Sequence, residues 1–165
     1  MNKQFKIVLT AIAAAAAFAS VGASAAEGTG TSTATVIVPI SIANDTALAF
    51  GKFTKAAGVI TMTPAGGRSA SGAPASLSTV TPGNAGQLTV SGDADATYTI
   101  AVLGGSLTGP GAASMTLDNI KVAAASATGT LITSGTIGAG GTQVLMTGGD
   151  LTVAADQVSG AYSGN

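Results

Sequence analysis

The chain has 165 residues, of which six are Lys or Arg, seven are Asp or Glu, and none is His or Cys. Charged residues make up only 8% of it, whereas ordinary soluble domains carry about 25%. Without Cys or His the chain cannot form disulfides, the usual zinc sites or the Ser-His and Cys-His nucleophile pairs, and without clustered Lys and Arg it is not suited to nucleic acid.

The N-terminus has the three-part pattern of a secretory signal peptide. Lys3 and Lys6 give a basic start, an apolar run covers Ile7–Val21, and Ala23-Ser24-Ala25 offers the small residues at which such peptides are cleaved. A transmembrane anchor is the alternative, but the run is shorter than the roughly 20 residues that a spanning helix needs. We therefore predict a helical signal peptide over residues 1–25 and a secreted mature chain, residues 26–165, with no membrane span.

The clearest strand signal follows the signal peptide, at Thr33–Ile42. Alternate residues there are small or branched and apolar, with a period of two that is typical of a strand. The residues on this apolar face are Ala34, Val36, Val38, Ile40 and Ile42. Pro39 has no N–H, so it favours an edge strand or a bend, and Asn44-Asp45 is expected to end the strand.

Short strands and loops are expected over the next part of the chain. Leu48 and Phe50 begin one strand, and Gly58–Thr63 forms another. The run Gly66–Gly72 is rich in Gly and Ser and is predicted to be a loop. Residues 75–80 are a weak strand.

The best hairpin signal joins Gln87–Ser91 to Thr97–Leu103 across Gly92-Asp93-Ala94-Asp95. In the second of these runs, Tyr98, Ile100 and Val102 share one face. Asp93 and Asp95 resemble a fragment of a calcium loop, but the further oxygen ligands are missing, so we expect a turn.

The remaining strands follow at short intervals. Gly104–Gly111 is expected to be a loop and Met115–Val122 a strand. Three shorter strands are expected at Thr130–Thr133, Gln143–Thr147 and Leu151–Val153, the last two joined by a turn at Gly148-Gly149-Asp150. Strands at this spacing predict a single all-β domain, a sandwich or a barrel, over residues 26–165.

No group of residues indicates catalysis. Asp118 and Lys121 are expected to form a surface ion pair rather than an acid–base pair, and Arg68 is expected to be solvated. We therefore predict no enzyme activity, no catalytic residues, no cofactor and no metal.

Several short stretches resemble the bacterial exported family called domain of unknown function 4402. They are Leu48-Ala49-Phe50-Gly51, Leu88-Thr89-Val90-Ser91-Gly92, Tyr98-Thr99-Ile100, Met115-Thr116-Leu117, Gly148-Gly149-Asp150-Leu151-Thr152-Val153 and Gly160-Ala161-Tyr162-Ser163-Gly164. The resemblance covers nearly the whole mature chain. It implies an antiparallel, Ig-like or pilin-like β-sandwich related to surface adhesins, with no catalytic residues.

Members of that family continue beyond the Gly-x-Tyr-x-Gly stretch into another strand, whereas this sequence stops at Asn165. We expect either a truncated sequence or a sandwich that lacks its final strand. Such a sandwich would accept a strand from another chain. Residues 26–43 are the candidate donor, with Ala34, Val36, Val38, Ile40 and Ile42 making the contacts; the alternative is that residues 33–42 are simply the domain's own first strand.

The leading functional hypothesis is a secreted structural subunit of a bacterial surface fibre, of the pilin or fimbrial type, assembled by strand complementation. Its partners would be copies of itself or related subunits, with a periplasmic chaperone and an outer-membrane usher. It would pass through the periplasm to the cell surface. The alternative is a monomeric exported adhesin that binds a glycan or a protein through its loops.

Overall fold

The computed structural model describes residues 28–72 and 77–164. The predicted signal peptide and the first residues of the predicted strand at 75–80 lie outside these ranges. Residues 28–35 form one unit and the chain from Val36 onward forms another. The described residues of the first unit form no helix or strand and are exposed.

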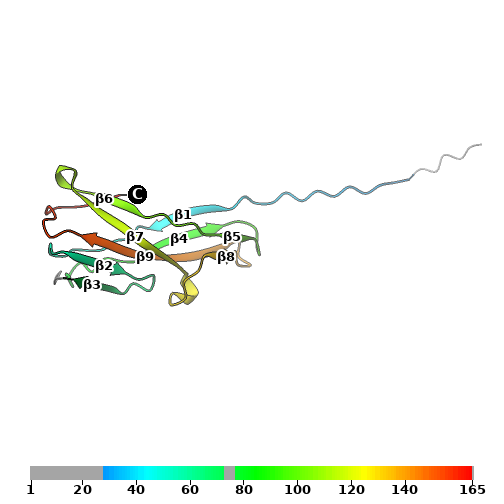
Figure 1. Ribbon diagram of the computed structural model, residues 1–165. Coiled ribbons are helices and arrows are strands. Elements are labelled where there is room, and N and C mark those ends of the chain that lie inside the picture. The colour runs from blue at the N-terminus through cyan, green and yellow to red at the C-terminus, as the bar shows by residue number, and fades with distance from the viewer. Residues whose placement is uncertain (1–27, 73–76, 165) are drawn as a thin grey trace, which may run out of the picture. The chain divides into compact units, whose positions relative to one another are not determined.

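This second unit is all-β with antiparallel sheets (Figure 1). The main sheet contains β1 (Ser41–Thr46), β2 (Gly58–Met62), β3 (Arg68–Gly72), β4 (Gly86–Ser91), β6 (Gly105–Thr108), β7 (Ser114–Ala124) and β9 (Thr142–Val153). A two-stranded sheet contains β5 (Thr97–Thr99) and β8 (Ser134–Thr136). The described residues contain no α-helix, only the 3-10 turns Pro110–Ala112 and Ala125–Ala127.

The long strand β9 organises the main sheet. Along one edge it pairs with β7, and along the other it pairs first with β4 and then with β2. β1 pairs with β4 and β6 pairs with β7, so each has a second edge that no other strand of the main sheet covers. The β1 edge and the residues that precede β6 form the site described below.

Apolar side chains from these strands form two buried clusters. One contains Phe50, Ile60, Met62, Met115, Leu151 and Val153. The other contains Val90, Val122, Ile137 and Leu145. Leu151 and Leu145 both lie on β9, so this strand contributes to both clusters.

The predicted turn at Gly148-Gly149-Asp150 is wrong, because β9 continues through it as a single strand. Glycine is needed at both positions because neighbouring atoms lie too close for a Cβ, and not because the chain turns there. A Cβ on Gly148 would overlap the carbonyl oxygen of Met62, and a Cβ on Gly149 would lie 2.8 Å from Cδ1 of Ile120. Glycine in a strand interior often marks such a close approach.

The predicted hairpin between Gln87–Ser91 and Thr97–Leu103 is also wrong. β4 pairs with β1 and β9, while β5 pairs with β8. The turn after β4 moves the chain out of the main sheet, with Asp95 in the left-handed region at a φ of 64°. Beyond β5, Ile100 donates its N–H to the Thr133 carbonyl at 2.8 Å, which holds the chain beside the residues leading into β8.

Both predicted loops contain strands. In Gly66–Gly72, a turn at Thr63 reverses the chain, and Arg68–Gly72 returns along β2 as β3. In Gly104–Gly111, the first residues form β6. The glycine-rich composition predicted loops, but pairing with a neighbouring strand decided the conformation.

The first strand of the domain also differs from its prediction. β1 begins at Ser41 rather than Thr33 and does not end at Asn44-Asp45. Asn44 pairs with Leu88 of β4, and the Asp45 carboxylate accepts a hydrogen bond from the Thr89 hydroxyl at 2.6 Å. These contacts with β4 keep the two turn-forming residues in an extended conformation.

Candidate interaction site: an exposed apolar segment and an open seam

Residues 36–40 form an apolar segment that leads into β1 and belongs to no strand. Val36 is 96% exposed, and Ile37 and Val38 are also largely exposed. Within the described chain, the one hydrogen bond that holds this segment runs from the Val38 N–H to Oδ2 of Asp93, at 3.0 Å. Large apolar side chains gathered in this way on a surface indicate a contact with another molecule.

The five predicted donor residues fall into two groups. Ala34, Val36 and Val38 are exposed and lie outside the strands, and the Val38 N–H bonds to Asp93. Ile40 and Ile42 lie at the start of the β1 edge, where they are half-exposed or more, and they line a groove. Of the five, the structure thus places Ile40 and Ile42 in this groove.

This groove, which we call the seam, has a volume of about 400 Å³ and lies between the β1 edge and the residues that connect β5 to β6. Its floor is formed by β4, β7 and β9. The lining residues are Ile40, Ile42, Leu88, Val90, Tyr98, Thr99, Ile100, Ala101, Val102, Leu103, Ile120, Val122, Leu145 and Thr147. None of them carries a charge at neutral pH, so the seam suits an uncharged apolar occupant.

One wall of the seam has unpaired backbone. Residues 101–104 belong to no strand, and none of the loop hydrogen bonds in the described chain involves their backbone. Val102 is half-exposed and Leu103 is 89% exposed. Sequence reasoning had placed Val102 in a hairpin and so missed this wall, although two large apolar residues directly before Gly104-Gly105 were a signal for it.

A second groove of about 710 Å³ lies toward the C-terminal residues, which line it together with Leu48 and Leu107. Here the Tyr162 hydroxyl donates to the Val158 carbonyl at 2.7 Å and accepts from Nε2 of Gln157 at 2.7 Å. Ser163 pairs with Thr108 of β6 in a single two-bond bridge. The C-terminal residues therefore cover the Thr108 end of β6, whereas the seam lies beside the residues that precede β6.

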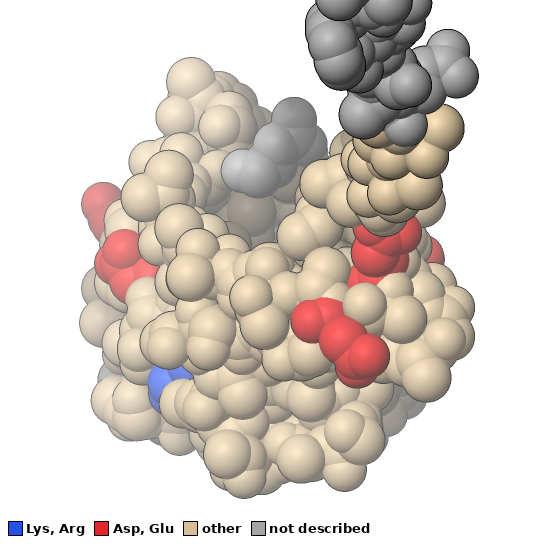
Figure 2. Space-filling view, turned by 90° about the vertical axis from the view of Figure 1, so that its right-hand side faces the viewer, with Lys and Arg blue, Asp and Glu red and all other residues tan. Residues whose placement is uncertain are grey.

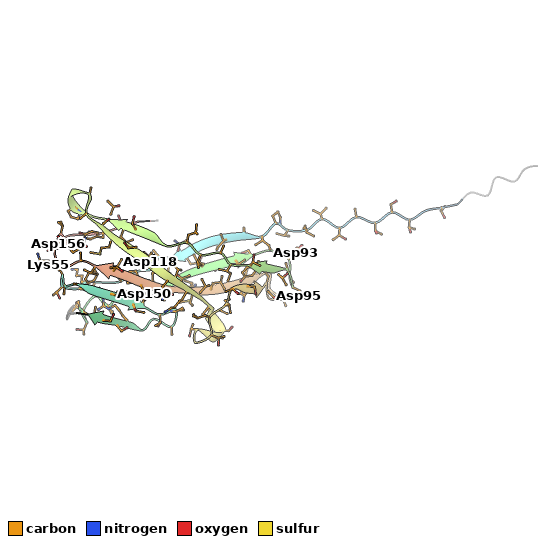
Figure 3. The ribbon with its side chains drawn as sticks, in the orientation of Figure 1. Lys55, Asp93, Asp95, Asp118, Asp150 and Asp156 are labelled. Carbon is orange, nitrogen blue, oxygen red and sulfur yellow. The ribbon has the colours of Figure 1, made fainter. Side chains whose placement is uncertain are left out.

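Charged side chains lie scattered over the domain. Figure 2 shows separate acidic patches and one basic patch on the face in view, and Figure 3 shows Asp93 and Asp95 at one end of the domain and Lys55 and Asp156 at the other. Across the described residues, no three acidic side chains lie close enough together to hold a metal ion. No helix in this part of the chain is long and apolar enough to cross a bilayer.

Asp118 and Asp150 face each other across β7 and β9. Asn119, at a φ of 49°, donates from Nδ2 to Oδ2 of Asp150 at 2.7 Å. Burial opposes ionisation of Asp150, but hydrogen bonds from Asn119 and Thr61 and the charge of Lys121 outweigh it, so the pKa of this carboxyl is lowered. Oδ1 of Asp150 is buried without a hydrogen-bond partner.

Arg68, which was predicted to be solvated, is half-buried and joins two loops. Its guanidinium donates to the carbonyl of Phe50 at 2.7 Å and to that of Ser78. Longer bonds of 3.4 Å reach the carbonyls of Lys52 and Thr81. The prediction failed because a guanidinium can satisfy several carbonyls at once, which the Gly/Ser surroundings of Arg68 did not indicate.

Residues 40–165 match the family described as domain of unknown function (DUF4402). The chain belongs to the DUF4402 family. The match confirms the resemblance predicted from the sequence. No curated protein and no solved structure matches this chain. The DUF4402 region includes Ile40, Ile42 and the whole seam, whereas Ala34, Val36 and Val38 precede it.

Proposed function

We propose that this DUF4402 protein is an exported structural subunit of a bacterial surface fibre, and that its copies join by β-strand complementation. The observation that carries the proposal is the uncharged apolar run at Val36–Ile40, which is exposed and unpaired beside the open edge of β1. A strand with exposed backbone groups and branched side chains is a ready template for pairing with another chain.

The finer architecture that we propose is a pilin-like sandwich with a place for one more strand. Support comes from the seam, which separates the β1 edge from the wall at residues 101–104. In strand complementation, main-chain hydrogen bonds give affinity and pockets for alternate side chains give specificity. Burying Val36 and Val38 alone would contribute about 3–6 kcal/mol before the entropy of ordering the segment is subtracted.

Each copy carries both a donor segment and a seam, which favours a chain of subunits. When two different surfaces of one molecule meet, the contact is head-to-tail, and it gives an open filament unless rotation closes a ring. The low charge of the chain, 8% of residues, fits close packing of copies, because few like charges would oppose it.

Export, with the help of a chaperone and an usher, is part of the proposal. The predicted signal peptide would direct the chain to the periplasm and then to the cell surface. An apolar segment and an open seam that are exposed in transit invite aggregation, so a periplasmic chaperone and an outer-membrane usher are the partners that we expect in addition to other copies.

Electrophoresis of the mature chain without heating tests this function. We expect an SDS-resistant ladder of multimers. The double variant Val36→Asp/Val38→Asp should reduce the ladder at least tenfold, because both changes fall on the donor face. Ile37→Asp is the matched control, since Ile37 is similarly exposed but on the other face of the alternation, and it should keep the ladder. A wild-type chain that stays a single monomeric species at high concentration would contradict the proposal.

A further inference from the structure

We infer that the seam is the acceptor site and that residues 34–38 of a second copy of this chain occupy it, lying along residues 101–104. This assignment rests on the proposed function, since it names where the donated strand binds. The sequence had indicated a donor segment without indicating which part of the domain would receive it.

The chemistry of the seam and of the segment agrees. The seam is lined by branched and aromatic apolar side chains and has no charged residue. The chain from residue 28 to residue 44 also contains no charged residue, and Ala34, Val36 and Val38 place small or branched apolar groups on one face. A charged peptide would have to give up the hydration of its charge in such a groove without finding an opposite charge.

The unpaired backbone of residues 101–104 also favours a strand as the occupant. Residues 101–104 have no strand partner in the described chain, although β6 directly after them is paired with β7. A strand laid along them would satisfy their N–H and C=O groups and would cover Val102 and Leu103. Five residues, 34–38, span about 16 Å at about 3.3 Å per residue, enough to reach along this wall.

The segment cannot fill the seam of its own copy. Ile40 already lines the seam, and Ser41 begins β1, which forms the opposite wall. For residues 34–38 to enter the same seam, the chain would have to reverse between Val38 and Ile40. A β-turn takes four residues, including its two ends, so a turn that ends at Ile40 would use Ile37 and Val38 and would remove both from the donor strand. A second copy is therefore the occupant.

Engineered cysteines can locate the contact, because the chain has no Cys of its own. The variant Val36→Cys/Val102→Cys, oxidised after assembly, should give disulfide-linked multimers that survive boiling and disappear on reduction. The control Val36→Cys/Val80→Cys has an equally accessible second cysteine, because Val80 is 90% exposed, but lies outside the seam. It should give at least tenfold fewer linked multimers.

A second variant pair keeps the test independent of disulfide geometry. Val102→Asp should keep the fold, because Val102 is half-exposed, yet reduce the unheated ladder at least tenfold, whereas Val80→Asp should keep it. If the wild-type ladder forms but the Val36–Val102 cross-link is no stronger than the control and Val102→Asp assembles normally, the seam is not the acceptor while the proposed function stands. An intramolecular disulfide in a monomer would also overturn the inference. If no ladder forms at all, the proposed function itself fails.

Discussion

The backbone N–H of Val38 donates a hydrogen bond to Oδ2 of Asp93, 3.0 Å away on the turn after β4. This bond links the candidate donor segment to its own domain, and the segment must exchange it for new contacts when it binds another copy. From the sequence Asp93 was expected to lie in a turn rather than a calcium loop. The turn is confirmed, with the Ala96 N–H bonded to the Asp93 carbonyl, and the Asp93 carboxylate makes this contact in addition.

Asp93→Ala should therefore loosen residues 36–40. We expect the Val38 amide to exchange with solvent at least fivefold faster, while global stability falls by less than about 1 kcal/mol, since the bond is exposed. Amide hydrogen exchange on the monomeric protein measures this. Asp93→Asn keeps an acceptor oxygen and should stay close to wild type. Unchanged exchange at Val38 in Asp93→Ala would show that the bond does not hold the segment.

Arg68 should contribute to stability through the carbonyls that it satisfies. Arg68→Met leaves the carbonyls of Phe50 and Ser78 without their donor, and we expect a loss of about 1–3 kcal/mol in the free energy of unfolding. Urea denaturation gives the value. Lys55→Met removes an exposed cation and serves as the control, with a change below about 0.5 kcal/mol. Equal effects of the two substitutions would contradict the role assigned to Arg68.

Three glycines should tolerate a methyl group to different extents. Gly148→Ala places Cβ against the backbone oxygen of Met62, which cannot move without disturbing β2, so we expect at least about 2 kcal/mol of destabilisation. Gly149→Ala meets the flexible end of Ile120 and should lose about 1 kcal/mol. Gly129→Ala has open space and should change little. Thermal or urea unfolding ranks the three, and any other order would be inconsistent with a continuous β9.

The Asp150 carboxyl should make stability depend on pH. Because its folded-state pKa is lowered, it stabilises the fold above its unfolded pKa of about 4, and this contribution is lost as the pH falls through the folded value. Asn119→Gly keeps the positive φ but removes the Nδ2 donor, so the Asp150 pKa should rise. NMR titration of the carboxyl carbon gives both values, and a pKa that is the same in the two proteins would contradict the account.

The sequence predicted the all-β class and the strands β2, β4, β7 and β9, whose alternating apolar residues include much of the core. The strands expected from Leu48 and Phe50 and at Thr130–Thr133 do not form, and the alternating residues Val36, Val38, Ile40 and Ile42 are exposed. β7 was found from Met115 and Leu117, and β9 from its two halves. Pairing was harder: Gly148-Gly149 resembles a turn, yet the glycines serve close packing against β2 and β7. Likewise Gly92–Asp95 resembles a hairpin turn, yet it carries the chain into another sheet. Whether such a segment turns, continues as a strand or joins another sheet depends on residues distant in sequence. Local residue preferences carry no information about them.

Only part of the candidate site could likewise be predicted from the sequence. The candidate donor residues Ala34, Val36 and Val38 could be named from their period of two and their neutrality. The seam could not, because it is formed by β1, β4, β7 and β9 together with residues 101–104, and their proximity depends on the sheet order. Ile40 and Ile42 were named as donor contacts, but they line the groove in their own chain.

The most direct test of strand complementation is amide hydrogen exchange, compared between assembled and dissociated wild-type protein. Residues 34–37 and 101–104 lack strand partners in the described chain, so both should exchange rapidly when dissociated, whereas the Val38 amide is already held by Asp93. We predict that both gain at least tenfold protection on assembly, while β3, which lies away from the seam, does not change. Assembled protein in which both segments still exchange as fast as in the dissociated form would contradict the account.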